Sequence, residues 1–173
     1  MQVPPASQRH RQPAALAASP TGPRLRGWLI LIGVGLVLLP LWLALFLEEE
    51  LAPAFTREVW TALTTPGSSV YHPLNAPALI FELGGNALLL VCALWLAVLF
   101  FLKRRRFPFL AVIFLLSAVL FYLVDYFVAR QLAAVHGLQG ADSIADLVGA
   151  LALCALLVPY LLISKRVKAT FVQ

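Results

Sequence analysis

The stretch that decides the fold is GWLILIGVGLVLLPLWLALFL, residues 27–47, which contains no charged side chain. A helix rises roughly 1.5 Å per residue, so these residues form a rod about 30 Å long, the thickness of the hydrocarbon core of a bilayer. The apolar core of a signal peptide has only about 7–15 residues. Residues 27–47 therefore predict a retained membrane span, and the Ala52-Pro53-Ala54 triplet, which imitates a cleavage site, leaves a cleaved signal peptide as the alternative.

Three further apolar runs of similar length follow this span, at residues 78–102, 108–129 and 143–163. Hydrophobic residues make up 61% of the chain and charged residues 12%, whereas about 45–50% and about 25% are usual for soluble domains. A soluble fold of this size could not cover so much apolar surface, which excludes a cytosolic enzyme, a disordered protein and a small disulfide scaffold. Residues 27–173 are therefore predicted to form an all-α integral membrane protein, a four-transmembrane-helix bundle.

The charges are sorted by segment. Residues 1–26, which have the composition of a disordered basic tail, hold four Lys and Arg residues, the loop 103–106 holds four and the stretch 165–168 holds three. None of the eight acidic residues lies in these segments. Because loops rich in Lys and Arg stay in the cytoplasm, this pattern predicts that both termini are cytoplasmic and that the acidic residues lie outside.

The first outer loop, residues 48–77, is long enough to contain a helix of its own. Thr56 can cap a short amphipathic helix, and the turn at Pro66-Gly67 can end it. Its apolar face would consist of Phe55, Val59, Trp60 and Leu63. Such a helix would lie on the membrane surface or over the bundle, with Trp60 at the level of the headgroups. The second outer loop is predicted at residues 130–142.

Four polar side chains interrupt the spans near their outer ends: Glu82, Asn86, Asp125 and Asp146. Ionisable groups within a membrane are costly, which makes them default candidates for function. In one interpretation, the carboxylates of three helices converge at the outer mouth of the bundle and bind a cation, a proton or a basic partner. In the other, each carboxylate caps or flanks a helix end at the interface, where the helix dipole suits Asp146 and where water or Arg130 satisfies Asp125.

Glu82 and Asn86 are the preferred pair within this candidate polar site. Residues four apart in sequence are neighbours on one helix face. The pair also lies beside Gly84-Gly85, where small residues allow two membrane helices to approach closely.

The C-terminal segment combines cations with apolar side chains. Lys165, Arg166 and Lys168 are typical of a cytoplasmic anchor that contacts anionic lipid headgroups. The Val, Thr and Phe residues between and after them suit docking on the inner end of the bundle or on a partner. The sequence leaves both interpretations open.

Other chemistry is sparse. Cys92 and Cys154 fall within spans and are expected to be small packing residues. The histidines, His10, His72 and His136, do not have the spacing of metal ligands. The sequence contains no catalytic triad, phosphate loop or dinucleotide fingerprint. It therefore predicts a protein without catalytic residues, cofactor or metal, which binds the lipid bilayer and no nucleic acid.

The chain resembles the YdgK-like family of bacterial inner-membrane proteins, known as domain of unknown function 2569. The similarity is carried by these strings, in order: Gly27-Trp28-Leu29-Ile30, Trp60-Thr61-Ala62-Leu63-Thr64, Tyr71-His72-Pro73-Leu74, Leu79-Ile80-Phe81-Glu82-Leu83, Gly85-Asn86, Phe100-Phe101, Arg106-Phe107-Pro108, Pro159-Tyr160 and the ending from Ser164 to Val172. The resemblance implies a four-helix multi-pass protein of the bacterial inner membrane. It implies no reaction, and it marks Trp60 and Tyr71 as candidate contacts of the first outer loop.

These observations favour a non-enzymatic accessory or interaction protein of the membrane. Its partner would be an unidentified membrane protein or further copies of the same chain. The alternative is a small proton- or cation-coupled transporter that acts as an oligomer, with Glu82 as the coupling group. Polar residues at the midplane, which a transport path would need, are missing apart from Asn86 at intermediate depth.

Overall fold

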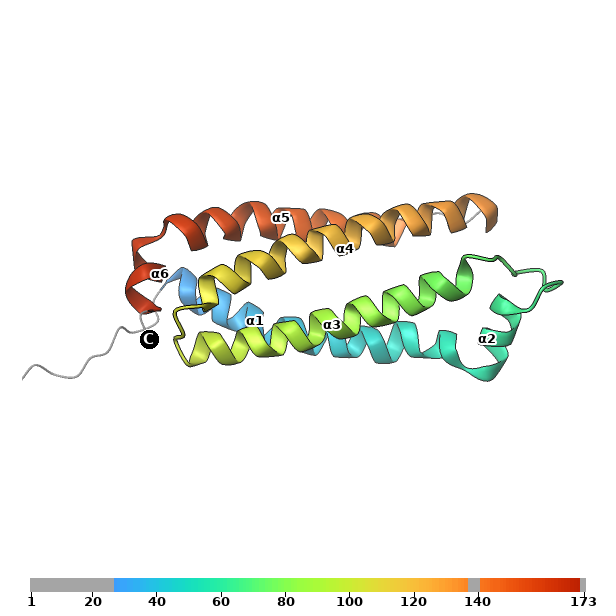
Figure 1. Cartoon of the computed structure of the whole chain (residues 1–173), viewed down its shortest axis with the longest axis horizontal. Helices are drawn as coiled ribbons and strands as arrows, with labels where there is room; N and C mark the ends of the chain where they lie inside the picture. The colour runs from blue at the N-terminus through green and yellow to red at the C-terminus, as the bar shows by residue number, and fades with distance from the viewer. Residues whose placement is uncertain (1–26, 137–140, 172–173) are drawn as a thin grey trace, which may run out of the picture.

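The computed structural model describes residues 27–136 and 141–171, and it is all-α throughout these residues (Figure 1). The helices, in chain order, are α1 (Trp28–Phe46), α2 (Arg57–Thr64), α3 (Asn75–Phe101), α4 (Phe107–His136), α5 (Ala141–Ile163) and α6 (Lys165–Thr170). The predicted basic tail at residues 1–26 lies outside the described residues.

Four of the helical segments in the described part of the chain are long and apolar enough to cross a membrane. They are Trp28–Phe55, Asn75–Phe101, Phe107–Leu132 and Ile144–Ile163. The prediction of a four-helix membrane bundle is confirmed at this level. Large apolar side chains such as Leu88, Trp95 and Phe109 point outward from the bundle, which suits an apolar solvent around it.

The predicted loops are wrong at two boundaries. Residues 48–55 continue α1 as a π-helical turn, Leu47–Leu51, and a 3₁₀ turn, Ala52–Phe55. α4 continues to His136, so residues 130–136 are helical where a loop was expected. Glu, Arg, Gln and Ala are good helix formers, so the apolar span ends at these positions while the helix continues. Residues 137–140, which hold both glycines of the predicted second loop, lie outside the described residues.

The predicted amphipathic helix of the first loop is confirmed as α2, and the turn at Gly67, with φ +99°, follows it. Phe55 and Trp60 share a face, and their rings stack with centroids 5.3 Å apart. The predicted role of Thr56 as a side-chain cap is wrong. Its hydroxyl instead donates a hydrogen bond to the carbonyl of Pro53 at 2.8 Å, because the preceding 3₁₀ turn brings that carbonyl within reach.

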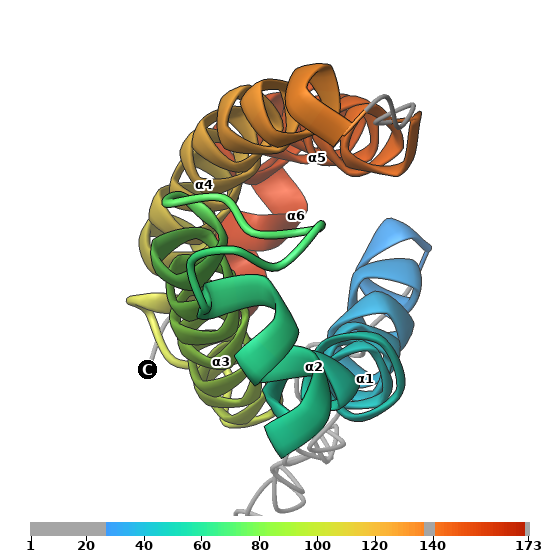
Figure 2. The same ribbon diagram turned by 90° about the vertical axis from the view of Figure 1, so that its right-hand side faces the viewer.

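The spanning helices are arranged in an open arc. α1 packs against α3, α3 against α4, and α4 against α5. Seen end-on in Figure 2, α1 and α5 form the two ends of this arc, and α2 covers one end of the bundle. Two cavities lined by residues of α1 and α5, together with residues of α3 and α4, lie along the inner side of this arc.

Two glycines let α3 approach its neighbours. A Cβ atom at Gly33 of α1 would lie 2.9 Å from the ring of Phe100, and one at Gly85 of α3 would overlap the ring of Phe121. The expectation that helices approach closely at Gly84-Gly85 is therefore met by Gly85. Gly84 faces open space.

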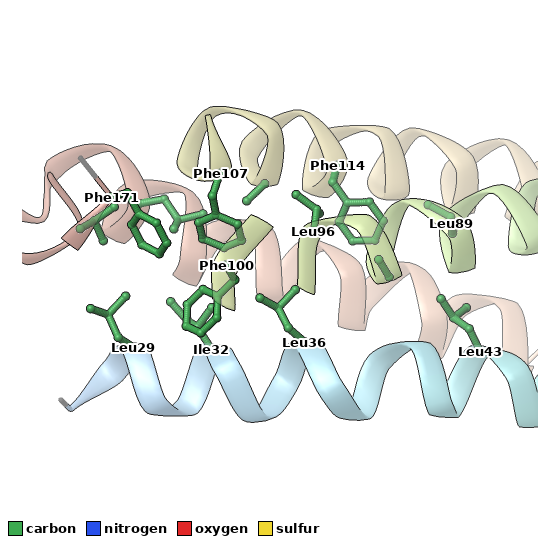
Figure 3. Close-up of a cluster of buried hydrophobic side chains, with 14 residues drawn as sticks. Leu29, Ile32, Leu36, Leu43, Leu89, Leu96, Phe100, Phe107, Phe114 and Phe171 are labelled. Carbon is green, nitrogen blue, oxygen red and sulfur yellow. The ribbon is translucent and has the colours of Figure 1, made fainter. Parts of the chain in front are cut away.

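The densest packing lies at the end of the bundle that carries α6. Phe100 is fully buried, and its ring lies edge-on to that of Phe107, with centroids 5.2 Å apart. Phe171 stacks on Phe107, with centroids 4.7 Å apart. Figure 3 shows these rings facing Leu29 and Ile32 of α1. We call Phe100, Phe107 and Phe171 the aromatic floor.

The C-terminal segment docks on the bundle. Val167 and Thr170 of α6 are buried, as is Phe171 in the aromatic floor, whereas Lys165, Arg166 and Lys168 are exposed. Of the two interpretations of this segment, the apolar half therefore packs on the protein itself, and the cations remain on the surface. We call this end of the molecule, with residues 103–106 beside α6, the basic end.

Candidate functional site

Three carboxylates converge at the opposite end of the bundle. Glu82 lies on α3, Asp125 on α4 and Asp146 on α5, and all three are partly buried. The negative charges of Asp125 and Asp146 act on Glu82, and the charge of Asp146 acts on Asp125. The hydroxyl of Tyr122, also partly buried, lies within the field of all three. We call Glu82, Tyr122, Asp125 and Asp146 the acidic mouth.

Their positions along the helices differ from those expected of helix caps. α4 continues for eleven residues after Asp125 and ends at His136. Glu82 lies seven residues after Asn75, the first residue of α3. Asp146 lies five residues after the start of α5, beyond the first turn in which the helix dipole acts, so the expectation that the dipole stabilises its carboxylate is wrong. Glu82 and Asp125 therefore lie well inside their helices rather than at a helix end.

Asn86 lies one turn from Glu82 and is 2% exposed. Its side-chain amide donates a hydrogen bond to the backbone carbonyl of Glu82 at 3.0 Å. Its side-chain oxygen is buried and has no hydrogen-bond partner among the described residues. A buried carbonyl oxygen normally accepts a hydrogen bond, so this atom is an acceptor available to a donor that enters the bundle.

An apolar groove runs from the acidic mouth along the space between α1 and α5. Its outer part is a cavity of about 240 Å³ that reaches Tyr122 and Asp146. Its inner part is a cavity of about 400 Å³ that reaches Trp28 and Leu161 near the basic end. The two parts share Leu39, Phe114, Leu115 and Leu153. We call this combined space the α1–α5 groove.

Two glycines line the groove at positions where no neighbouring side chain occupies the space that a Cβ atom would fill. Gly35 of α1 lines the inner part and Gly149 of α5 lines the outer part. A Cβ atom at either position would meet no heavy atom within 4 Å. They differ in this respect from Gly33 and Gly85, where a neighbouring ring fills the space. At Gly35 and Gly149 the missing side chain leaves room in the groove itself.

The sequence missed Tyr122 and the groove. Tyr122 is three residues before Asp125 on the same helix, and this spacing could have identified it as a neighbour on one face. The groove left no comparable signal, because the residues that line it have the same apolar character as those that face the lipid.

Trp60 and Tyr71, the candidate contacts of the first outer loop, make contacts within that region of the chain. Trp60 stacks on Phe55, and the backbone amide of Tyr71 donates to the carbonyl of Ser68 at 3.2 Å. The loop is fastened by Asn75, which the sequence did not single out. Its side-chain amide donates to the carbonyls of Leu63 and Val70 at 3.0 and 2.9 Å.

At the basic end, the three predicted contact residues of α6 form an exposed surface next to the turn at 103–106. Arg166 also reaches the start of α1, where its guanidinium lies 3.3 Å from the position of a Cβ atom at Gly27. These residues are separated from the acidic mouth by the length of the bundle (Figure 1). The two candidate sites therefore lie at opposite ends of the bundle.

Within residues 27–136 and 141–171, no group of three His, Cys, Asp or Glu side chains is arranged to hold a metal ion. Cys92 and Cys154 are free and partly buried.

Comparison with known proteins identifies the family. No curated protein and no solved structure matches the chain. Residues 23–172 match the family described as protein of unknown function, DUF2569, and this range contains the whole bundle, the acidic mouth and α6. The more specific YdgK-like name stays a prediction. The chain therefore belongs to the DUF2569 family of proteins of unknown function.

Proposed function

We propose that this protein is a non-enzymatic accessory protein of the bacterial inner membrane, which binds a partner that carries positive charge at the outer face. The observation that carries the proposal is the convergence of Glu82, Asp125 and Asp146 from three different helices. Like charges brought together inside a bundle oppose folding, and a cationic partner would offset this repulsion.

The proposal includes a multi-pass topology with both termini in the cytoplasm. The basic end carries the cations of α6 and of the turn at 103–106, and the acidic mouth lies at the other end. Basic segments are retained in the cytoplasm, so the acidic mouth would face outward. Reporter fusions after Arg106 and at the C-terminus should both give cytoplasmic signals. An external signal from either one would reverse the proposed orientation.

Native mass spectrometry of the protein released from gently extracted membranes tests the binding function. The wild-type protein should carry a component at a fixed ratio, whether a second protein, a further copy or a lipid. A variant with Glu82→Gln, Asp125→Asn and Asp146→Asn should lose that component. Glu58→Gln, which changes an exposed acid on α2, is the matched control and should retain it. A bare monomer for the wild-type protein would overturn the proposal.

A proton- or cation-coupled transporter that acts as an oligomer is the second candidate. It is favoured by the buried oxygen of Asn86, one turn deeper than Glu82, which could accept a hydrogen bond from a moving donor. The apolar lining of the α1–α5 groove favours it less, since polar cargo needs polar partners along its path. Proton-dependent uptake into vesicles should then be abolished by Glu82→Gln and kept by Glu58→Gln. Unchanged uptake in Glu82→Gln vesicles would exclude Glu82 as the coupling group.

A further inference from the structure

We infer that the α1–α5 groove binds a lipid whose hydrocarbon chain lies in the groove and whose primary ammonium head contacts the acidic mouth. The inference rests on the proposed function, because it assigns a chemical class to the positively charged partner. It follows from the size of the groove, from its glycines and from the charge at its outer end.

The size of the groove favours a chain over a helix. Its inner and outer cavities measure about 400 and 240 Å³, within or near the range of small-molecule sites. A membrane-spanning helix roughly 10 Å wide and 30 Å long occupies about 2,400 Å³. Each cavity is smaller than a whole membrane-spanning helix, so a helix would place only one face of its side chains there, whereas a single hydrocarbon chain is narrow enough to lie within the groove.

The length of the groove also suits one long chain. On α5 the lining extends from Asp146 to Leu161, a distance of about 22 Å at roughly 1.5 Å per residue. Its walls are almost entirely hydrocarbon, supplied mainly by leucines of α1 and α5. A chain that entered at the acidic mouth would thus meet apolar side chains along its whole path toward the basic end.

The glycines show where the chain would pass. Gly35 lies on α1 and Gly149 on α5, the helices at the two ends of the arc, and a Cβ atom at either position would meet no heavy atom of another part of the chain within 4 Å. Where a helix carries glycine, the missing side chain lets another group approach the backbone closely. At Gly33 and Gly85 that group is a phenylalanine ring of the protein. At Gly35 and Gly149 it would be the bound chain.

The charge at the outer end selects the head. Asp146 and Tyr122 line the groove there, and Glu82 and Asp125 add negative charge within interaction range. A primary ammonium group has three N–H donors that carboxylate and hydroxyl oxygens can accept. A quaternary ammonium head has none, and the net negative charge of a phosphatidylglycerol head would be repelled. The site should therefore prefer an ethanolamine head to a choline or glycerol head.

Tryptophan fluorescence provides the test, because Trp42 lines the outer part of the groove and Trp95 lies outside it, 64% exposed on α3. Two single-tryptophan proteins, each with the other three tryptophans changed to Phe, are reconstituted in phosphatidylcholine vesicles. A small fraction of the lipid is replaced by brominated phosphatidylethanolamine, phosphatidylcholine or phosphatidylglycerol. Brominated phosphatidylethanolamine should quench Trp42 on the order of fivefold more effectively than the other two, the ratio expected of one ammonium–carboxylate contact. Trp95 should not distinguish the three lipids.

Two groups of variants separate the chain from the head. Gly149→Leu should abolish the extra quenching of Trp42, and Gly84→Leu, which also meets open space but lies outside the groove, should leave it unchanged. Asp146→Asn should remove the preference for ethanolamine while quenching by all three chains continues. Melting curves of each variant verify that the bundle is folded.

Equal quenching of Trp42 by the three lipids, matching that of Trp95, would overturn the inference, since the groove would then hold only ordinary bilayer lipid. If the native protein still carried a protein partner that the triple amide variant loses, the proposed function would stand without the lipid. If the triple amide variant retained its bound component and Trp42 still preferred ethanolamine, the acidic mouth would have no role in binding. In that case both the proposed function and the head-group assignment would fail.

Discussion

The basic end and the acidic end of the bundle differ in how their interiors are filled. At the basic end, the aromatic floor and α6 close the bundle with the chain's own side chains. At the acidic end, the charges of three carboxylates act on one another, and the groove beside them is lined by Gly35 and Gly149, where a Cβ atom would meet no heavy atom within 4 Å. One end is filled by apolar side chains of the chain itself, and the other brings like charges within interaction range above an apolar groove.

The largest expected effect is at the aromatic floor. Phe100→Ala removes a fully buried ring that contacts Phe107, Phe171 and Gly33. It should lower the free energy of unfolding by about 3 kcal/mol, the low end of the range for soluble cores, because lipid can solvate the opened site. Unfolding by a denaturing detergent measures this change. Phe101→Ala, whose ring is 55% exposed, is the matched control and should cost far less.

This pair of neighbours also shows what the sequence could and could not predict. Four spans followed from length and charge alone, because a bilayer sets the length of a helix and the cost of a charge within it. Which face of a span points inward did not follow. Phe100 and Phe101 are both phenylalanines, yet the first is buried and the second exposed. Residue type does not separate them, because the interior of the bundle and the surrounding lipid are equally apolar.

The candidate polar site was predictable in part for the same reason. Glu82, Asn86, Asp125 and Asp146 stood out because polarity is rare in a span, and the charges of the three carboxylates act on one another. That these residues form a site stays a prediction. The groove and the docking of α6 depend on how helices pack around each other, which residue types alone do not encode. The extension of α4 to His136 was missed because polarity marked the end of the span but not of the helix.

Glycine substitutions compare the packed and the open regions directly. Gly85→Ala would place a methyl group in the ring of Phe121, so it should destabilise the bundle by about 2 kcal/mol. Gly84→Ala, at the adjacent residue, meets open space and should stabilise the helix by about 0.5 kcal/mol through its better helix propensity. Thermal unfolding of both variants under the same conditions gives the two values. The same sign for both would show that α3 and α4 do not meet at Gly85.

Removing a charge from the acidic mouth should raise the free energy of unfolding, whereas removing a ring from the aromatic floor should lower it. Asp125→Asn removes one of three neighbouring like charges, so it should raise the free energy of unfolding by about 1 kcal/mol in the absence of a ligand. The double variant with Asp146→Asn should gain less than the sum of the two single changes, because both remove the same repulsion. Additive gains in this double-mutant cycle, measured at neutral pH, would mean that the two carboxylates do not interact.

The smallest change in the free energy of unfolding is expected from substitutions on the exposed face of α6, which can be compared with the buried face of the same helix. Lys165→Gln together with Lys168→Gln should change the free energy of unfolding by less than about 0.5 kcal/mol, because both side chains are exposed. Val167→Ala, on the buried face of the same helix, should cost about 1–2 kcal/mol. Detergent unfolding of the two variants separates the roles of the faces: the apolar face closes the bundle, and the basic face is left for lipid headgroups. A large loss from the lysine changes would instead make these cations part of the fold, and the basic end would no longer be closed by apolar packing alone.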